Sequence, residues 1–373
     1  MKIAFYTDQT YLHGGIERVL SNKINYLLSE TSHEVFLITS EQRGKSSCYQ
    51  MHPNVKHHDL GINYNRQKSY LDLRNLLKAP KHFFRLKRKL KELQPDVLII
   101  CNYAFDFFFI PFLSRRTLKI KEYHSSRFYY DIERKGNTSF KKKIKYKIDD
   151  YIEAKYDYLV LLTDDEKQYY KSSNLVVIPN AITSYPTTSA VLEAKKIISA
   201  GRIAPVKGFE KLICCVEKVF KVYPDWSLEI YGGGDTFYIN ELKKLIAEKN
   251  LENHIRLCGS TSELDKQLLA SSIYAMSSKT ECFPMVLLES LSNGLPVVSF
   301  DCPNGPRNIV TDSVDGILVE DQNITELSQA LLNLIGNEEL RKKMGQKARK
   351  NMLRFKPEIV MKRWEALFLK NTN

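Results

Sequence analysis

Short β-prone runs alternate with runs of helical periodicity along nearly the whole chain of 373 residues. We expect strands at residues 2–7, 34–39, 97–101, 118–123, 158–163 and 175–178, with a helix at 16–30 after the first strand. Strands that alternate with helices predict an α/β fold with parallel sheets. Ligands of such doubly wound sheets bind at the carboxyl ends of the strands, so the loops there are where chemistry is expected.

The alternation is interrupted at residues 179–189, where turn and linker residues gather. A second series follows, with strands expected at 196–203, 227–231, 255–258, 274–277 and 297–300. Helices are expected at 210–223, 238–250, 262–272 and 285–293, and a final run of helices from residue 325. A chain of this length exceeds one typical core. We therefore predict two domains, with a boundary that puts residues 1–183 in the first and 184–357 in the second.

The composition is that of a globular protein, with 43% hydrophobic and 27% charged residues. No apolar run reaches the eighteen or so residues that span a bilayer. The first residues enter a strand at once and show no signal-peptide cleavage pattern, so we expect a cytoplasmic protein. Seven cysteines, an odd number without zinc-site spacing, are expected to be reduced thiols.

Positive charge is concentrated in two blocks of the first half. Residues 66–95 hold ten Lys/Arg against two acids, and residues 115–147 hold twelve against three, while the whole chain carries +13. In the first block, an apolar stripe at helical spacing consists of Phe83, Leu86, Leu90 and Leu93. Such a helix could lie on an anionic membrane or dock its stripe on a sheet. Residues 66–147 thus suggest a peripheral position on the inner face of the cytoplasmic membrane. Nucleic acid is disfavoured because no nucleic-acid-binding motif is recognisable.

Glu281 and Glu289 lie on either side of Pro284, which is suited to the first position of a helix. Glu281 then belongs to the loop before the helix and Glu289 to the helix itself. The first N–H groups of that helix would lack acceptors and could bind an anion; they belong to Met285, Val286 and Leu287. Carboxylates beside an anion site favour a nucleotide sugar over a free phosphate, although two solvated charges would give the same spacing.

Two glycine-containing loops at predicted strand ends are further candidates. Gly14 and Gly15 precede the helix at 16–30, where backbone could approach a ligand or make a tight turn. The segment from Gly201 to Gly208 carries Arg202 and Lys207 beside a helix start, and these cations could close on a diphosphate or remain solvated.

Together these segments resemble glycosyltransferase family 4, retaining enzymes of the GT-B fold. The resemblance rests on the two glycine loops, on the Glu281 and Glu289 pair and on residues 179–181, Pro-Asn-Ala. Residues 299–306, Ser-Phe-Asp-Cys-Pro-Asn-Gly-Pro, resemble members that build bacterial capsule, lipopolysaccharide and lipid-linked oligosaccharides. The resemblance to family 4 implies two Rossmann-like doubly wound domains facing across a cleft, with the last residues, about 358–373, packed on the N-terminal domain.

The resemblance also implies roles for particular residues. Arg202 and Lys207 would bind the donor diphosphate, and Gly14 with Gly15 would reach the same phosphates. Glu281 would contact hydroxyls of the donor sugar. The other implied contacts are Glu289 with the ribose, the backbone of Phe283, Pro284, Met285 and Val286 with sugar and phosphate, Gly232 and Gly259 with the base, and His124 with the transferred sugar. Without the resemblance, His124 would be read as a solvent-facing residue at a strand end.

The implied reaction moves a hexose-type sugar, by family habit from a UDP-sugar, to a saccharide or lipid-linked acceptor in cell-surface polysaccharide synthesis, with retention. No D-x-D motif occurs, and Arg202 with Lys207 can replace a divalent ion, so we expect no metal and no cofactor. The stretch Gly232-Gly233-Gly234-Asp235 is richer in glycine than the family's usual G-x-G, and Asp235 could select against extra phosphate or cap a helix. A sugar-nucleotide epimerase and a non-catalytic membrane- or nucleic-acid-binding protein stay as alternatives.

Overall fold

The computed structural model describes residues 1–70, 72–182 and 185–370. The chain forms two compact units, one of Met1–Pro179 with Val360–Asn373 and one of Asn180–Ile359. Each unit contains its own parallel sheet and hydrophobic core, so the α/β fold with two Rossmann-like domains is confirmed. The predicted boundary at residues 183 and 184 lies outside the described residues.

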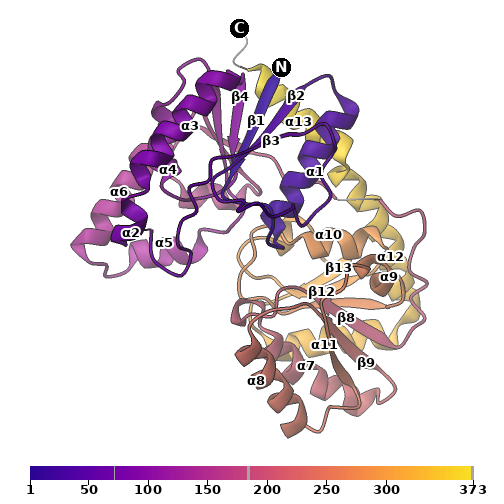
Figure 1. Cartoon of the computed structure of the whole chain (residues 1–373). Coiled ribbons are helices and arrows are strands. Elements are labelled where there is room, and N and C mark those ends of the chain that lie inside the picture. The colour runs from indigo at the N-terminus through magenta and orange to yellow at the C-terminus, as the bar shows by residue number, and fades with distance from the viewer. Residues whose placement is uncertain (71, 183–184, 371–373) are drawn as a thin grey trace. The chain divides into compact units, whose positions relative to one another are not determined.

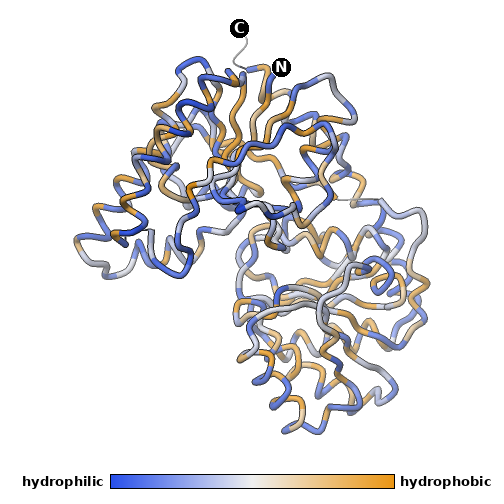
Figure 2. Tube along the Cα trace, in the orientation of Figure 1, coloured by the Kyte–Doolittle hydropathy of each residue, from blue (hydrophilic) through white to orange (hydrophobic). Residues whose placement is uncertain are grey.

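The sheet of the first unit has seven strands in the order β3-β2-β1-β4-β5-β6-β7, and every pairing is parallel. The order reverses between β1 and β4, and Phe5 of β1 lies between Leu37 and Ile99. The strands are β1 (Lys2–Thr7), β2 (Glu34–Thr39), β3 (Lys56–Asp59), β4 (Val97–Ile100), β5 (Leu118–Glu122), β6 (Tyr158–Leu161) and β7 (Leu175–Val177). Because helices cover both faces of such a sheet, the inner strands β1, β2, β4 and β6 are largely apolar (Figure 2), whereas β5, Leu-Lys-Ile-Lys-Glu, buries three charged side chains.

Helices lie on both sides of this sheet, with α3 on one side and α1 and α13 on the other (Figure 1). The helices of the first unit are α1 (Gly15–Glu30), α2 (Leu73–Leu76), α3 (Ala79–Leu93), α4 (Asp106–Phe109), α5 (Phe128–Lys135) and α6 (Phe140–Glu153). Helix α13 (Pro357–Leu369) begins in the second unit and continues into the first, where it buries Trp364. The Lys23 ammonium lies 4.3 Å from the centre of the Trp364 ring.

The apolar stripe of α3 faces the core of the first unit. Leu86, Leu90 and Leu93 are buried in that core, and Phe83 packs against it. Of the two interpretations of this helix, docking of the stripe on the sheet is therefore the one observed. The stripe is not available to a membrane surface.

The second unit has a six-stranded parallel sheet in the order β10-β9-β8-β11-β12-β13. Its strands are β8 (Lys196–Ala200), β9 (Ser227–Tyr231), β10 (Ile255–Gly259), β11 (Ile273–Met276), β12 (Val297–Phe300) and β13 (Gly316–Val319). Its helices are α7 (Phe209–Val222), α8 (Thr236–Glu248), α9 (Leu264–Leu269), α10 (Met285–Ser292), α11 (Ile324–Gly336) and α12 (Glu338–Met352). The 3₁₀ turns of the two units are η1 (Ile110–Phe112), η2 (Asp165–Tyr169), η3 (Pro205–Lys207), η4 (Pro306–Asn308) and η5 (Leu353–Phe355).

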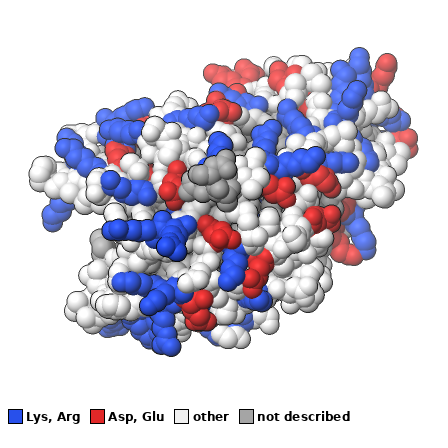
Figure 3. Space-filling view, turned by 90° about the horizontal axis from the view of Figure 1, so that it is seen from above, with Lys and Arg blue, Asp and Glu red and all other residues white. Residues whose placement is uncertain are grey.

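Among the helices that the structure describes, none is both long and apolar enough to cross a bilayer. Figure 3 shows one face of the molecule, on which lysine and arginine side chains cover more of the surface than acidic side chains do. The charge imbalance found in the sequence is thus displayed on the exterior.

Candidate functional site

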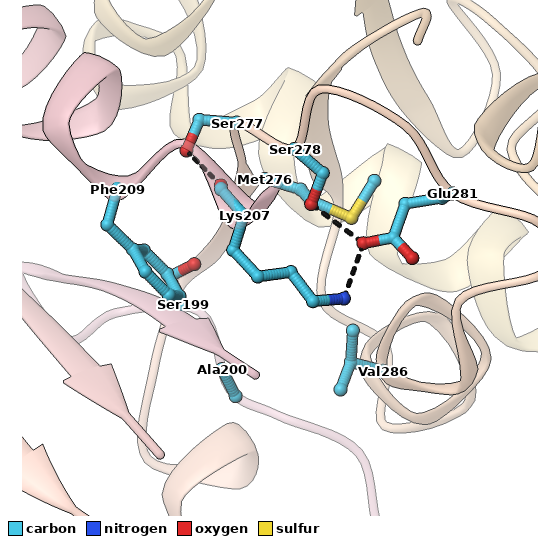
Figure 4. Close-up of a pocket in the computed structure, with 9 residues that line it drawn as sticks. All are labelled: Ser199, Ala200, Lys207, Phe209, Met276, Ser277, Ser278, Glu281 and Val286. Carbon is cyan, nitrogen blue, oxygen red and sulfur yellow. Dashed lines mark hydrogen bonds and ion pairs between the residues drawn. The ribbon is translucent and has the colours of Figure 1, made fainter. Parts of the chain in front are cut away.

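Two loops at the carboxyl end of the second sheet bring Lys207 and Glu281 into contact. Lys207 ends the turn η3 between β8 and α7, and Glu281 lies between β11 and α10. The Lys207 Nζ atom is 2.6 Å from Glu281 Oε1, and the Ser278 hydroxyl donates to the same oxygen at 2.7 Å (Figure 4). The cation predicted for the diphosphate and the carboxylate predicted for the sugar therefore form one ion pair.

Close backbone packing holds Lys207 against the loop that follows β11. Gly208 has a φ of 61°, and a Cβ atom there would lie 2.2 Å from the Ser277 carbonyl oxygen. The Ser277 hydroxyl donates to the Lys207 carbonyl at 3.2 Å, and the Lys279 N–H donates to the Val206 carbonyl at 2.8 Å. Glycine is thus required at 208 both for the left-handed backbone and for the approach of the two loops.

Arg202 follows the end of β8 by two residues, and its side chain is exposed. Within the described parts of the chain, the structure shows no ion pair or side-chain hydrogen bond for it. Arg202 is therefore not brought into contact with Glu281 as Lys207 is, and its guanidinium stays accessible to a ligand from solvent.

The backbone of Glu281 is fixed by the loop after β12. The Glu281 N–H donates to the Pro303 carbonyl at 2.9 Å, and the Glu281 carbonyl accepts from Asn304 at 2.8 Å and from Gly305 at 2.9 Å. The Thr280 hydroxyl also donates to Pro303, at 2.6 Å. From the sequence alone, residues 299–306 showed only a resemblance to glycosyltransferase family 4 and had no predicted role in the site. The structure shows that this segment fixes the backbone from which the Glu281 carboxylate extends.

Helix α10 begins at Met285, as the predicted range 285–293 has it, but Pro284 is its N-cap and not its first residue. One prediction about its N–H groups is wrong, since Leu287 donates to the Pro284 carbonyl at 3.0 Å. This short contact is a 3₁₀-type bond that tightens the first turn. The first two N–H groups, of Met285 and Val286, remain the candidates for an anion.

Both carboxylates of the pair are largely withdrawn from solvent. Glu289 is buried within α10, and the Glu281 side chain is only 11% exposed. The interpretation of two solvated surface charges is therefore wrong. Phe283 and Pro284, also predicted for the donor, lie in the buried turn between Glu281 and α10.

A small pocket joins these groups (Figure 4). It is lined by Ser199, Ala200, Lys207, Phe209, Met276, Ser277, Ser278, Glu281 and Val286. One ammonium, one carboxylate and three hydroxyls thus meet at the carboxyl ends of adjacent strands. The cavity between these side chains is about 10 Å³, enough for one water molecule, so a ligand that carries negative charge and hydroxyl groups would contact the set from outside it.

The glycine-rich stretch after β9 has a structural reason. A Cβ atom at Gly232 would lie 1.8 Å from the Gly201 carbonyl oxygen, and one at Gly234 would lie 2.0 Å from the Ile203 carbonyl oxygen. The Gly232 N–H donates to the Gly259 carbonyl at 2.8 Å, so the two glycines predicted near the base do lie together. Asp235 accepts from the Tyr238 N–H at 2.9 Å and thus caps α8, as one of its two interpretations predicted.

In the first unit, Gly14 and Gly15 lie at the start of α1, with Gly14 as its N-cap. Gly15 is the first residue of α1, and a Cβ atom there would meet nothing within 4 Å. A Cβ atom at Gly14 would meet only the end of the Glu17 side chain, at 2.3 Å. Neither glycine is required by packing against backbone, in contrast to Gly232 and Gly234.

His124 follows β5 and is held in a buried polar group. Its Nε2 atom is 3.4 Å from Glu122 Oε2, and Glu122 also pairs with the Lys23 ammonium. Burial raises the pKa of Glu122, but Lys23 and His124 outweigh it and hold that pKa well below its usual range. The His124 side chain is only 7% exposed, so its interpretation as a solvent-facing strand-end residue is wrong.

This group is also the one set in the described chain whose geometry could hold a metal ion, through Cys101, Glu122 and His124. Burial, with the Glu122 charge, raises the pKa of the Cys101 thiol, which therefore stays protonated, and the Lys23 ammonium already occupies Glu122. A metal ion would have to displace both the proton of the Cys101 thiol and the Lys23 ammonium. These three side chains therefore do not favour metal binding.

Sequence reasoning missed a charged cluster at the carboxyl ends of β1 and β2. Arg66 pairs with Asp8 and, at 3.1 Å, with the buried Glu41. Nearby in the same unit, burial raises the pKa of Asp106 to about 7. Asp8 directly follows β1 and Glu41 lies two residues beyond β2, so the rule of strand carboxyl ends could have found both.

Comparison with known proteins agrees with this geometry. Residues 184–351 match the family model of glycosyl transferases group 1, and residues 13–184 match that of glycosyltransferase family 4. An uncharacterised glycosyltransferase of Haemophilus influenzae is 30% identical over 372 residues, which cover 98% of this chain and 99% of that protein. The poly(glycerol-phosphate) alpha-glucosyltransferase of Bacillus subtilis is 28% identical over 261 residues, which cover 67% of this chain and 38% of that one.

A solved structure of a TarM mutant from S. aureus, in complex with Fondaparinux, alpha-GlcNAc-glycerol and UDP, superposes with a TM-score of 0.77 at 17% identity. The match covers 98% of this chain and 99% of that chain. Two parallel-sheet domains with a polar pocket at the strand ends define a protein of the GT-B class. The chain belongs to glycosyltransferase family 4.

Proposed function

We propose that this glycosyltransferase moves a hexose-type sugar from a UDP-sugar to a saccharide or lipid-linked saccharide, with retention, in cell-surface polysaccharide synthesis. The observation that carries the proposal is the contact of Lys207, Glu281 and Ser278 beside the start of α10. An ammonium, a carboxylate and two N–H groups thus lie together at the carboxyl ends of two adjacent strands, β8 and β11. The names of relatives, which include a poly(glycerol-phosphate) alpha-glucosyltransferase, support a cell-surface acceptor.

Breaking the bond between the sugar and the diphosphate leaves a dianion, and fixed positive groups lower the barrier by stabilising it. Lys207, the accessible Arg202 and the N–H groups of Met285 and Val286 would serve this purpose. Glu281 would then turn from Lys207 toward the sugar hydroxyls. With the acceptor attacking from the same face as the leaving phosphate, that phosphate takes the acceptor's proton, and no carboxylate nucleophile is needed.

The remaining predicted residues fit supporting roles in the same reaction. Glu289 would bind the ribose, the loops of Gly232 and Gly259 the base, and Gly14 with Gly15 the phosphates. The open space at Gly15 supports this last role, because nothing in the fold itself requires glycine there. His124 would contact the transferred sugar, with Glu122 holding its ring.

The reaction would need no metal and no cofactor besides the donor substrate. Arg202 and Lys207 supply the positive charge that a divalent ion supplies elsewhere, and they do so from fixed loops. Activity unchanged by EDTA would agree with this proposal, and restoration of lost activity by Mg²⁺ or Mn²⁺ would contradict it.

The decisive experiment measures donor binding and transfer together. Thermal unfolding is followed with UDP-, GDP- and ADP-sugars, since a ligand of the native state raises the melting temperature. We expect UDP-sugars to give the largest shift, and Lys207→Gln to abolish it. Lys279→Gln is the matched control, because this lysine lies on the neighbouring loop but pairs with Glu210 at 2.9 Å.

Product analysis separates transfer from the epimerase alternative. Glycosyl transfer requires an acceptor, whereas an epimerase converts the nucleotide sugar alone. Conversion of the donor without acceptor would overturn the proposal, and so would the absence of any nucleotide-dependent shift in melting. We further propose a lipid-linked acceptor reached from the inner face of the cytoplasmic membrane, and no nucleic-acid partner.

A further inference from the structure

Helix α6 displays large apolar side chains to solvent. Phe140 is 77% exposed, Ile144 43%, Ile148 45% and Tyr151 57%. Their spacings of four, four and three residues place them on one side of the helix, within about 80° of rotation at about 100° per residue. They form a continuous stripe, which we call the α6 stripe.

The opposite side of α6 attaches the helix to its unit. Tyr146, Asp149, Ile152 and Glu153 are buried there. The Asp149 carboxylate accepts hydrogen bonds from Tyr103 at 3.0 Å and from Tyr130 at 2.8 Å. The exposure of the α6 stripe is therefore a consequence of a well-anchored helix and not of a poorly packed one.

Lysines flank the stripe. By the same rotation, Lys141 lies on one side of it and Lys143 and Lys147 on the other. These three side chains are exposed, and in the part of the chain that the structure describes no carboxylate pairs with them. The two lysines that do pair with acids, Lys142 with Glu133 and Lys145 with Asp149, point back toward the body of the unit.

We propose that the α6 stripe and its three flanking lysines form a docking surface for an anionic lipid bilayer. The helix would lie in the plane of the membrane, with Phe140, Ile144 and Ile148 among the acyl chains near the headgroups and Tyr151 at the polar boundary. The lysines would contact the lipid phosphates. The membrane contact would thus be made by the α6 stripe and not by the stripe of α3, which is buried in the core.

The charge pattern selects a bilayer as the occupant. A protein groove that receives an apolar stripe commonly offers acids to particular lysines, whereas a lipid surface presents negative charge on both sides of an inserted helix at once. The α6 stripe has unpaired lysines on both of its sides. The inference concerns binding only, so it holds independently of the donor and of the reaction proposed above.

Co-flotation with vesicles tests the proposal. The full-length protein is mixed with vesicles of phosphatidylglycerol and phosphatidylcholine, and separately with vesicles of phosphatidylcholine alone. We expect binding to the first and little to the second. Replacing Lys141, Lys143 and Lys147 together by glutamine should weaken binding on the order of 10²-fold, since each base near the surface contributes about fivefold. Phe140→Ser with Ile144→Ser should also abolish binding.

The matched control is the triple variant K343Q/K347Q/K350Q on α12. It removes three exposed lysines that also lack an acidic partner among the described residues, and it should leave binding unchanged. Equal losses in the two triple variants would show a non-specific charge effect and overturn the proposal. Absence of binding by the unaltered protein would also overturn it and would leave a protein partner as the occupant.

A fluorescence variant keeps the test independent of folding defects. The two natural tryptophans, Trp226 and Trp364, are buried. Ile144→Trp therefore adds the one tryptophan on the α6 stripe. Its emission should shift to the blue and become protected from acrylamide when anionic vesicles are added. An emission that stays unchanged while the protein binds vesicles would place the contact elsewhere and refute the proposal.

Discussion

Replacing Glu281 by glutamine should move the affinity for UDP and the turnover number in opposite directions. The Glu281 carboxylate lies 2.6 Å from the Lys207 ammonium. A diphosphate must compete with that carboxylate for the same cation. Glutamine keeps the shape of the side chain but removes its charge, so Lys207 becomes free for the diphosphate while the sugar loses its carboxylate contact.

The size of the effect follows from the exposure of the pair. At this separation and an effective dielectric constant of about 20, the bare attraction is about 6 kcal/mol. The two side chains are only 23% and 11% exposed, so the cost of desolvating both charges and of ordering the side chains offsets most of this attraction and leaves about 1 kcal/mol. UDP should therefore bind to Glu281→Gln about fivefold more tightly. Turnover should fall about 10²- to 10³-fold, as for loss of one transition-state contact.

Titration calorimetry with UDP and a steady-state assay with donor and acceptor measure the two quantities. Glu338→Gln on α12 is the control, because it removes an acid paired with Lys342 on a surface helix and should change neither quantity. Parallel weakening of UDP binding and turnover would refute the reasoning, since it would mean that Glu281 supports the diphosphate site. Unchanged turnover would remove Glu281 from the reaction.

Four other substitutions test the packing. Gly234→Ala should lower the free energy of unfolding by about 2–3 kcal/mol, because its Cβ would press on the Ile203 carbonyl, whereas Gly15→Ala should leave the melting temperature unchanged and reduce only transfer. Equal melting shifts in calorimetry would contradict this. Burial lowers the pKa of His82 from 6.5 to about 4. The free energy of unfolding therefore keeps the full contribution of neutral His82 above pH 6.5 and falls by about 3 kcal/mol as the pH is lowered from 6.5 to 4. Urea titrations of His82→Gln should lack this fall. Glu122→Gln should destabilise the first unit by about 3–5 kcal/mol at neutral pH by leaving the Lys23 ammonium buried alone. That difference should shrink below the ordinary glutamate pKa of 4.5, and a gap that stays constant with pH would exclude the ion pair as its source.

Most strands inside both sheets were predictable because parallel strands are covered on both faces and are therefore largely apolar along their length, with β5, Leu-Lys-Ile-Lys-Glu, as an exception. The residues of β4, Val-Leu-Ile-Ile, are such a run. The edge strands β3 and β13 were not predicted. β3 is Lys-His-His-Asp and largely exposed, so it lacks the apolar pattern. β13 is apolar only at Ile317, Leu318 and Val319, a run too short to stand out from the sequence around it.

The position of Glu281 in a loop before a helix was also predictable, because proline acts on the backbone beside it. The function of residues 303–305 was not, since hydrogen bonds to Glu281 cross more than twenty positions of sequence. The stripe of α3 and the stripe of α6 show the same limit. Both have helical periodicity and abundant lysine, and burial alone distinguishes the one that packs on the sheet from the one that faces solvent.

Local rules of backbone and periodicity were thus sufficient for the alternation of strands and helices, the two-domain α/β class and the loops that carry the candidate residues. They act between neighbours in the chain, where sterics and hydrogen bonding leave few choices. The contact between Lys207 and Glu281 joins residues 74 positions apart and exists because β8 pairs with β11. Which charges meet, and which apolar side chains stay in water, depends on that pairing and packing.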